Sequence, residues 1–162
     1  MPIATVTASA VDVLVQATTD VFDTMVFRAI APQEPIWGHD LRPTSQIVGT
    51  VGFTGSSSGV VSFHASLEAA RDVTSAMLGQ SDNPEDVVVD AIGEIANMIA
   101  GAFRTRMARP DDVWAITVPT LTVGSDFYIK PITEADRAIV GFMMDAHQLF
   151  VELIITPARL AD

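Results

Sequence analysis

Residues 90–101 read DAIGEIANMIAG, and the spacing of residue types in this stretch decides how the whole chain is interpreted. Apolar residues recur here every three or four positions, which predicts a helix with one broad buried face. These residues are Val88, Ala91, Ile92, Ile95, Met98, Ile99, Ala102 and Phe103. A second set falls on another face at the same spacing, namely Asp90, Glu94, Asn97, Gly101 and Arg104. We call this second set the polar stripe.

Glycines in and beside the polar stripe disfavour the helix that carries it. Gly93 and Gly101 each cost a helix roughly 1 kcal/mol relative to alanine. One explanation is that they let the helix pack closely within its own fold, while Glu94 and Asn97 are merely solvated. The other explanation is that they keep the surface low, so that a second molecule can approach the carboxylate and the carboxamide. The residue pattern alone leaves both explanations open.

Two further helices are expected before this one. The first covers about residues 10–28, with Ser9 and Asp12 placed to cap its start. The second begins after Ser66 as its cap and ends at Gly79, which would take the left-handed conformation.

The helix with the polar stripe is expected to run from Pro84, capped by Asn83, to about Met107. Residues 46–66 contain two β-branched runs around GSSSG, which predicts a β-hairpin. Residues from Trp114 onward are strand-like and end in two strands around a short turn. The order of helix, hairpin, two helices and several strands predicts an α+β fold in a single domain over residues 1–162.

The composition excludes several classes of function. The chain of 162 residues is 49% hydrophobic, which is enough to form a core without covalent links. It has no cysteine, so disulfides, thiolate metal sites and cysteine nucleophiles are excluded. Its net charge of −11 argues against binding nucleic acid, which needs clustered Lys and Arg.

No feature of the sequence predicts a signal peptide, a membrane span or a metal site. The first residues, MPIATVTASAVDVLVQA, lack a basic n-region, so we expect no signal peptide and a cytoplasmic protein. No apolar run approaches the ~20 residues that a membrane span needs. His39, His64 and His147 lie in different segments without metal-ligand spacing, so no metal site is expected.

DAIGEIANMIAG resembles the D-x-x-x-E-x-x-N signature of the CheC/CheX/FliY group of bacterial chemotaxis phosphatases. ATTDVFDTMV resembles the first helix of that family, and IVGTVGFTGSSSGVVSFHAS resembles its first hairpin. CheC and FliY carry two E-x-x-N helices, whereas CheX carries one. The first helix here has Asp20-Val21-Phe22-Asp23 at the nearest equivalent position, so the resemblance favours CheX. It implies a single CheC/CheX-like α+β domain, with an antiparallel-rich sheet packed against a long signature helix and two further helices.

The resemblance also implies an enzyme that hydrolyses the aspartyl-phosphate of a CheY-like response-regulator receiver domain. Asn97 would position the attacking water, because a carboxamide can donate and accept hydrogen bonds without adding charge near phosphate. Glu94 would pair with the active-site lysine of the receiver. The receiver would supply Mg²⁺, and this chain would bind no cofactor of its own.

The resemblance implies that other residues of the signature helix contact the partner. Gly93 and Gly101 would let the receiver's loops reach the helix, and Asp90 fits the motif, although a structural capping role suits it equally. Arg104 stands where CheX-like chains usually have lysine, which changes the neighbouring surface and leaves the identity of the partner open. The resemblance further implies a homodimer joined through its sheets.

Two alternatives to catalysis remain at the level of sequence. The chain could be a non-catalytic CheX-fold module that binds a receiver or another signalling protein, or a dimerisation domain that keeps E-x-x-N as a vestige. The intact Glu94 and Asn97 pair favours catalysis. The acidity of the chain mildly disfavours docking to an acidic receiver.

Overall fold

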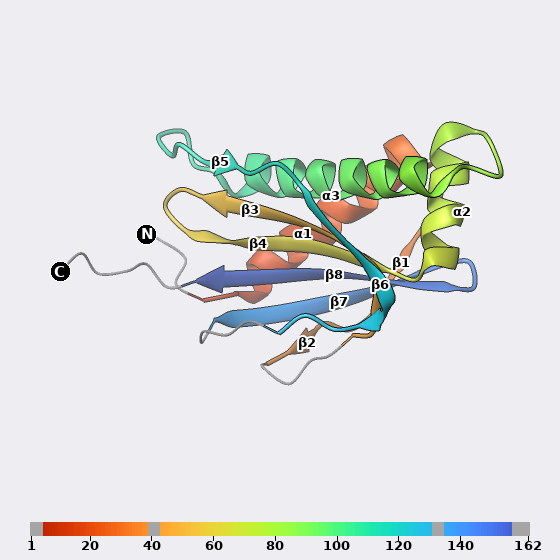
Figure 1. Ribbon diagram of the computed structural model, residues 1–162. Helices are drawn as coiled ribbons and strands as arrows, with labels where there is room; N and C mark the ends of the chain where they lie inside the picture. Colours follow the sequence, from red (N-terminus) through yellow and green to blue (C-terminus); the bar gives the residue numbers. More distant parts are fainter. Residues whose placement is uncertain (1–4, 39–42, 131–134, 157–162) are drawn as a thin grey trace.

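An antiparallel sheet with helices on one face forms the core of the computed structural model, which describes residues 5–38, 43–130 and 135–156 (Figure 1). The helical elements are α1 (Ala8–Val21), the π-helical turn η1 (Phe22–Val26), α2 (Leu67–Leu78) and α3 (Glu85–Met107). The strands are β1 (Ala31–Pro32), β2 (Ile36–Trp37), β3 (Ser45–Thr54), β4 (Ser58–Ala65), β5 (Ala115–Ile116), β6 (Thr120–Phe127), β7 (Asp136–Met144) and β8 (His147–Thr156). The α+β class predicted from the sequence is confirmed.

Two hairpins form the centre of the sheet. The strand order is β1-β7-β8-β4-β3-β5, with β2 also pairing with β7 and β6 with β3. Every pair is antiparallel, and the β3–β4 hairpin turns within GSSSG as predicted. The two hairpins join through β4 and β8, where Val61 lies opposite Leu153.

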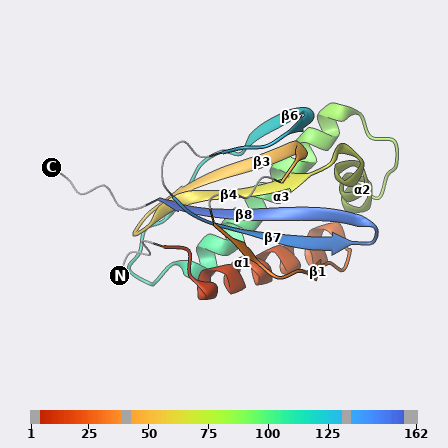
Figure 2. The ribbon, with the colours of Figure 1, turned by 90° about the horizontal axis from the view of Figure 1, so that it is seen from below.

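One face of this sheet is covered by α1 and α3. In Figure 2, α1 lies on one side of the central strands and β6 lies at the β3 edge, on the side away from α1. Alternate residues of the central strands point toward the helices and are fully buried, as the two-residue period of a strand requires. They include Phe63, Val140, Val151 and Leu153.

Small residues let α3 approach β3 closely. A Cβ atom at Gly49 would stand 2.8 Å from the Cβ of Ala96 and 3.3 Å from the carbonyl oxygen of Ile92. No side chain larger than hydrogen fits at Gly49 without moving the helix. This contact fixes which side of α3 faces the sheet and which side faces outward.

The start and end of α1 differ from the sequence prediction. Thr7, and not Ser9, caps the helix, because the Thr7 side chain accepts a hydrogen bond of 3.0 Å from the backbone N–H of Ala10. Regular α-helix stops at Val21, where the wider turn η1 begins, and does not continue to residue 28. Phe27 ends this turn in the left-handed conformation, with φ of 60°.

The ends of the other two helices were predicted more closely. Ser66 caps α2 by accepting a 3.1 Å hydrogen bond from Ala69, and Gly79 ends it in the left-handed conformation. Helix α3 reaches Met107 as predicted, but Pro84 occupies the cap position that was assigned to Asn83. The Asn83 amide instead donates a 2.7 Å hydrogen bond to the carbonyl of Gln80 and closes the preceding loop.

Candidate functional site

The polar stripe lies on the outward side of α3, as predicted. Asp90 and Glu94 are exposed, and Asn97, Gly101 and Arg104 are partly exposed. The stripe spans the middle and the C-terminal part of the helix. A second molecule could therefore meet all five positions along one helical surface.

The opposite side of α3 is locked into the hydrophobic core. Ile92, Ile95, Ile99 and Phe103 are each at most 1% exposed and belong to the main buried cluster, as the sequence predicted. Because interiors are close-packed, the helix cannot rotate without breaking these contacts. The direction in which the polar stripe points is thus fixed by the fold.

Glu94 and Asn97 project side by side from this rigid support. Residues three apart on a helix have Cβ atoms about 5–6 Å from one another. Neither side chain forms a hydrogen bond or ion pair with any residue that the structure describes. Both groups are therefore free to bind another molecule. The Glu94 carboxylate can only accept hydrogen bonds, whereas the Asn97 carboxamide can both donate and accept them.

The two glycines near this pair have different surroundings. Gly93 is buried, and a Cβ atom there would lie 3.0 Å from the Cδ2 of Leu121 on β6. It serves packing within the fold, and its expected part in admitting a partner's loops stays a prediction. A Cβ atom at Gly101 would meet nothing within 4 Å, so this position does leave the helix surface bare.

The region of α1 that corresponds to a second signature helix carries a different interaction. Asp20, near the end of α1, forms an ion pair with Arg106 of α3. Asp20 and Asp23 thus supply no carboxamide here, in agreement with a single E-x-x-N pair in the chain.

A buried polar network crosses the other side of the sheet and was not anticipated from the sequence. Arg137 of β7 donates to the Glu152 carboxylate of β8 and also, at 3.4 Å, to the carbonyl of Ile129. His64 of β4 shares a 3.0 Å hydrogen bond with Ser45 of β3. All four side chains are at most 4% exposed, which puts the network out of reach of a partner. One signal was visible in the sequence: His64, Arg137 and Glu152 are each out of phase with the core-facing residues of their strands.

Burial decides the charge states in this network. Desolvation, and then the positive charge of Arg137, lower the pKa of His64 from 6.5 to about 4, so the ring is neutral at pH 7. Burial raises the pKa of Glu152, an effect that the charge and hydrogen bond of Arg137 oppose. The Nε2 of His64 lies 4.0 Å from Glu152, which is too far for a hydrogen bond, and has no other partner among the described residues.

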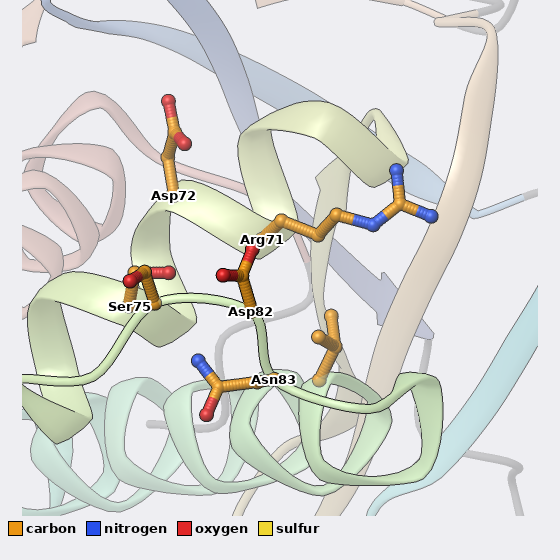
Figure 3. A pocket seen from close by; sticks show the side chains of 7 residues that line it. Arg71, Asp72, Ser75, Asp82 and Asn83 are labelled. Atoms are coloured by element: carbon orange, nitrogen blue, oxygen red, sulfur yellow. The ribbon is translucent and has the colours of Figure 1, made fainter.

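A hollow of about 270 Å³ lies apart from the polar stripe, beside α2 and the loop that follows it (Figure 3). It is lined by Arg71, Asp72, Ser75, Ser81, Asp82, Asn83 and Val88. In Figure 3, the side chains of Arg71 and Asp72 extend from α2 in different directions. The hollow is open and includes no residue of the stripe, so it does not extend the candidate site.

The described part of the chain contains no group of three or more His, Asp or Glu residues arranged to hold a metal ion. Within the same residues, no helix has the length and apolar character needed to cross a membrane.

Comparison with known proteins places this geometry in a family. Residues 47–143, which include Glu94 and Asn97, match the chemotaxis phosphatase CheX family. The CheY-P phosphatase CheX of Thermotoga maritima is 34% identical over 86 residues, covering 52% of this chain and 56% of that protein. The match thus spans little more than half the length of this curated relative.

Solved structures agree on the fold. The chemotaxis protein CheX from Desulfovibrio desulfuricans is 25% identical, with a TM-score of 0.83 over 91% of this chain and 99% of that one. The CheX chain of a CheX–CheY–BeF₃–Mg²⁺ complex from Borrelia burgdorferi is 22% identical, with a TM-score of 0.79 over 91% and 97% of the two chains. The family match covers more than half of the sequence and contains the whole of helix α3. The chain therefore belongs to the chemotaxis phosphatase CheX family.

Proposed function

We propose that this chain is a phosphatase that hydrolyses the aspartyl-phosphate of a CheY-like response-regulator receiver domain. The observation that carries the proposal is the free Glu94 and Asn97 pair on the outer side of a helix whose inner side is fixed in the core. The name of the Thermotoga maritima relative and the complex of the Borrelia burgdorferi protein with CheY support the same substrate class.

Asn97 would orient the attacking water. In the reaction, the water oxygen bonds to phosphorus while the bond between phosphorus and the aspartyl oxygen breaks. The products are inorganic phosphate and a free aspartate carboxylate, and the water loses a proton. Phosphoryl transfer is catalysed mainly by positioning and electrostatics, so a neutral amide that accepts from water and donates to a neighbouring oxygen is sufficient.

Glu94 would hold the receiver in place. Its exposed carboxylate lies one turn before Asn97 and is free to form an ion pair with a lysine of the receiver's active site. The Borrelia burgdorferi complex contains Mg²⁺ together with CheY, and we assign the Mg²⁺ that assists phosphoryl transfer to the receiver. The chain itself would need no cofactor.

We further propose a cytoplasmic homodimer. Strand β6 pairs with β3 along one edge, and its other edge pairs with none of the described strands. Val123 on β6 is 42% exposed and Val118 just before it is 83% exposed. Open edge strands tend to pair with another chain, and a two-fold copy would cover this edge and leave the polar stripe free.

A panel of phosphorylated receivers from the same genome tests the proposed activity. At least one receiver should lose phosphate faster in proportion to the concentration of this chain, and chelation of Mg²⁺ should abolish the acceleration. A panel in which receivers bind but none loses phosphate faster would contradict the proposal and favour a non-catalytic binding module.

A further inference from the structure

Arg104 is the cation of the polar stripe, and its side chain has no partner among the described residues. It follows Asn97 by seven residues, which is two helical turns and places both side chains on the same face. The next arginine of the helix, Arg106, is paired with Asp20 on α1. The Arg104 side chain forms no ion pair or hydrogen bond with any residue that the structure describes.

The surface between Arg104 and Asn97 is bare. Side chains of a helix lean toward its N-terminus, so Arg104 leans over the turn that contains Gly101. A Cβ atom at Gly101 would have no neighbour within 4 Å, so no side chain of the described residues fills the space there. The guanidinium group is therefore free to extend along the stripe toward Asn97.

The length of the arginine side chain decides what it can reach. Asn97 and Arg104 are separated by about 10 Å along the helix axis. An extended arginine side chain reaches roughly 7 Å from its Cα by ordinary bond lengths. Arg104 thus stops short of a phosphoryl group held in front of Asn97, but it reaches the partner surface beside that group.

Because the chain is acidic, the positive charge of Arg104 matters for docking to a phosphorylated partner. The net charge is −11, and the N-terminal part of the stripe adds the carboxylates of Asp90 and Glu94. An aspartyl-phosphate is also negative, so approach to this face is opposed by repulsion. A free guanidinium on the same face offsets part of that repulsion, and its planar fork fits a carboxylate in bidentate fashion.

We propose that Arg104 is a docking and specificity residue that binds a carboxylate on the receiver surface beside the phosphorylated aspartate. This inference rests on the proposed function and adds a way in which the chain selects among receivers. A receiver without an acidic residue at that place would be a poorer substrate. Arg104 takes no part in the chemical step.

The test compares Arg104→Gln and Arg104→Lys with the control Arg109→Gln. Arg109 is exposed, lies beyond the end of α3, and also lacks an ion pair among the described residues. Three quantities are measured with the most active receiver of the panel: kcat and KM for loss of phosphate, and the Kd for the receiver carrying beryllofluoride in place of phosphate. Thermal unfolding checks that each variant is folded.

Arg104→Gln should raise KM and Kd roughly tenfold, as loss of a close charge pair at a docking surface does, with kcat unchanged. Arg104→Lys should recover part of the loss, and Arg109→Gln should match the unmodified chain. Unchanged KM and Kd in Arg104→Gln would overturn the inference, as would a fall in kcat alone, which would place Arg104 at the reacting group. If no receiver is dephosphorylated, the proposed function fails, and the Kd comparison, made with a receiver that binds, still decides the role of Arg104. Failure of every receiver to bind would overturn both.

Discussion

Glu94 and Asn97 are neighbours on α3, but we expect them to have separate tasks. Glu94 forms an ion pair only when the partner docks, so Glu94→Ala should weaken receiver binding roughly tenfold and also slow phosphate loss. Folding should be unaffected, because the side chain is exposed and free of partners within the described residues. Titration of the beryllofluoride-bound receiver gives the affinity.

The matched control for this variant is Glu85→Ala, on the same helix. Glu85 is exposed in the first turn and lies on the opposite face from Glu94. Its removal should leave the affinity unchanged. Equal affinity of Glu94→Ala and the unmodified chain would remove the docking role of Glu94.

His64 makes the stability of the fold depend on pH. Its pKa is lowered from 6.5 to about 4 in the folded chain, so the unfolded chain binds a proton first as pH falls. The free energy of unfolding should lose about 3 kcal/mol from this residue between pH 6.5 and pH 4. The raised pKa of Glu152 acts with the opposite sign, because the folded chain then binds a proton first.

A comparison with His64→Gln isolates the histidine contribution. The amide can still bond to Ser45, but it does not titrate, so stability of the variant should fall less between pH 7 and pH 5 than that of the unmodified chain. Urea unfolding at the two pH values measures the difference. Parallel pH dependence in the two proteins would show that His64 is not buried as a neutral ring.

At the scale of the element, three glycines on or facing α3 have different surroundings. Gly49 lets the helix approach β3, Gly93 accommodates Leu121, and Gly101 faces open space. Helical periodicity predicted the stripe and the buried face of α3, because both follow from local geometry. It could not assign Gly93, because the residue that covers it comes from β6, far along the chain.

Gly101→Ala separates stability from function on this helix. The added methyl group meets no atom within 4 Å, so the substitution should raise the free energy of unfolding by about 1 kcal/mol through helix propensity. The same methyl group stands on the docking surface between Asn97 and Arg104 and should lower phosphatase activity. Denaturant unfolding and the phosphatase assay test the two effects.

Gly49→Ala provides the contrast. Its Cβ would stand within 2.8 Å of Ala96, so this variant should lose roughly 1–3 kcal/mol of stability through overpacking. If Gly101→Ala were also destabilised, or if it kept full activity, the interpretation of Gly101 as part of the docking surface would be wrong.

At the scale of the whole molecule, the open edge of β6 predicts a two-fold dimer. Light scattering at micromolar concentration should give twice the 17.3 kDa of one chain. Val123→Lys places a charge on this exposed edge strand and should shift the mass toward the monomer. A stable monomer of the unmodified chain at that concentration would contradict the dimer.

Part of the whole fold could be predicted from the sequence, and part of it could not. The class of the fold, the hairpin at GSSSG and the extent of α3 follow from periodicity and turn residues, and the structure confirms them. The network of Arg137, Glu152 and His64 was missed, because its members come from three strands whose pairing is set by tertiary contacts. The cap of α1 at Thr7 was missed because Ser9 is an equally good capping residue, and only the extended backbone at Thr7 decides between them.

The central claim is that Asn97 positions the water that attacks phosphorus. The most direct measurement is the rate of phosphate loss from the most active phosphorylated receiver, with the unmodified chain and with Asn97→Ala at saturating concentration. We expect the substitution to slow the catalysed rate by roughly two orders of magnitude or more, with receiver binding largely intact, because a positioning group has been removed. If Asn97→Ala matched the unmodified chain in rate, the mechanism would be contradicted, and α3 would be a binding surface alone.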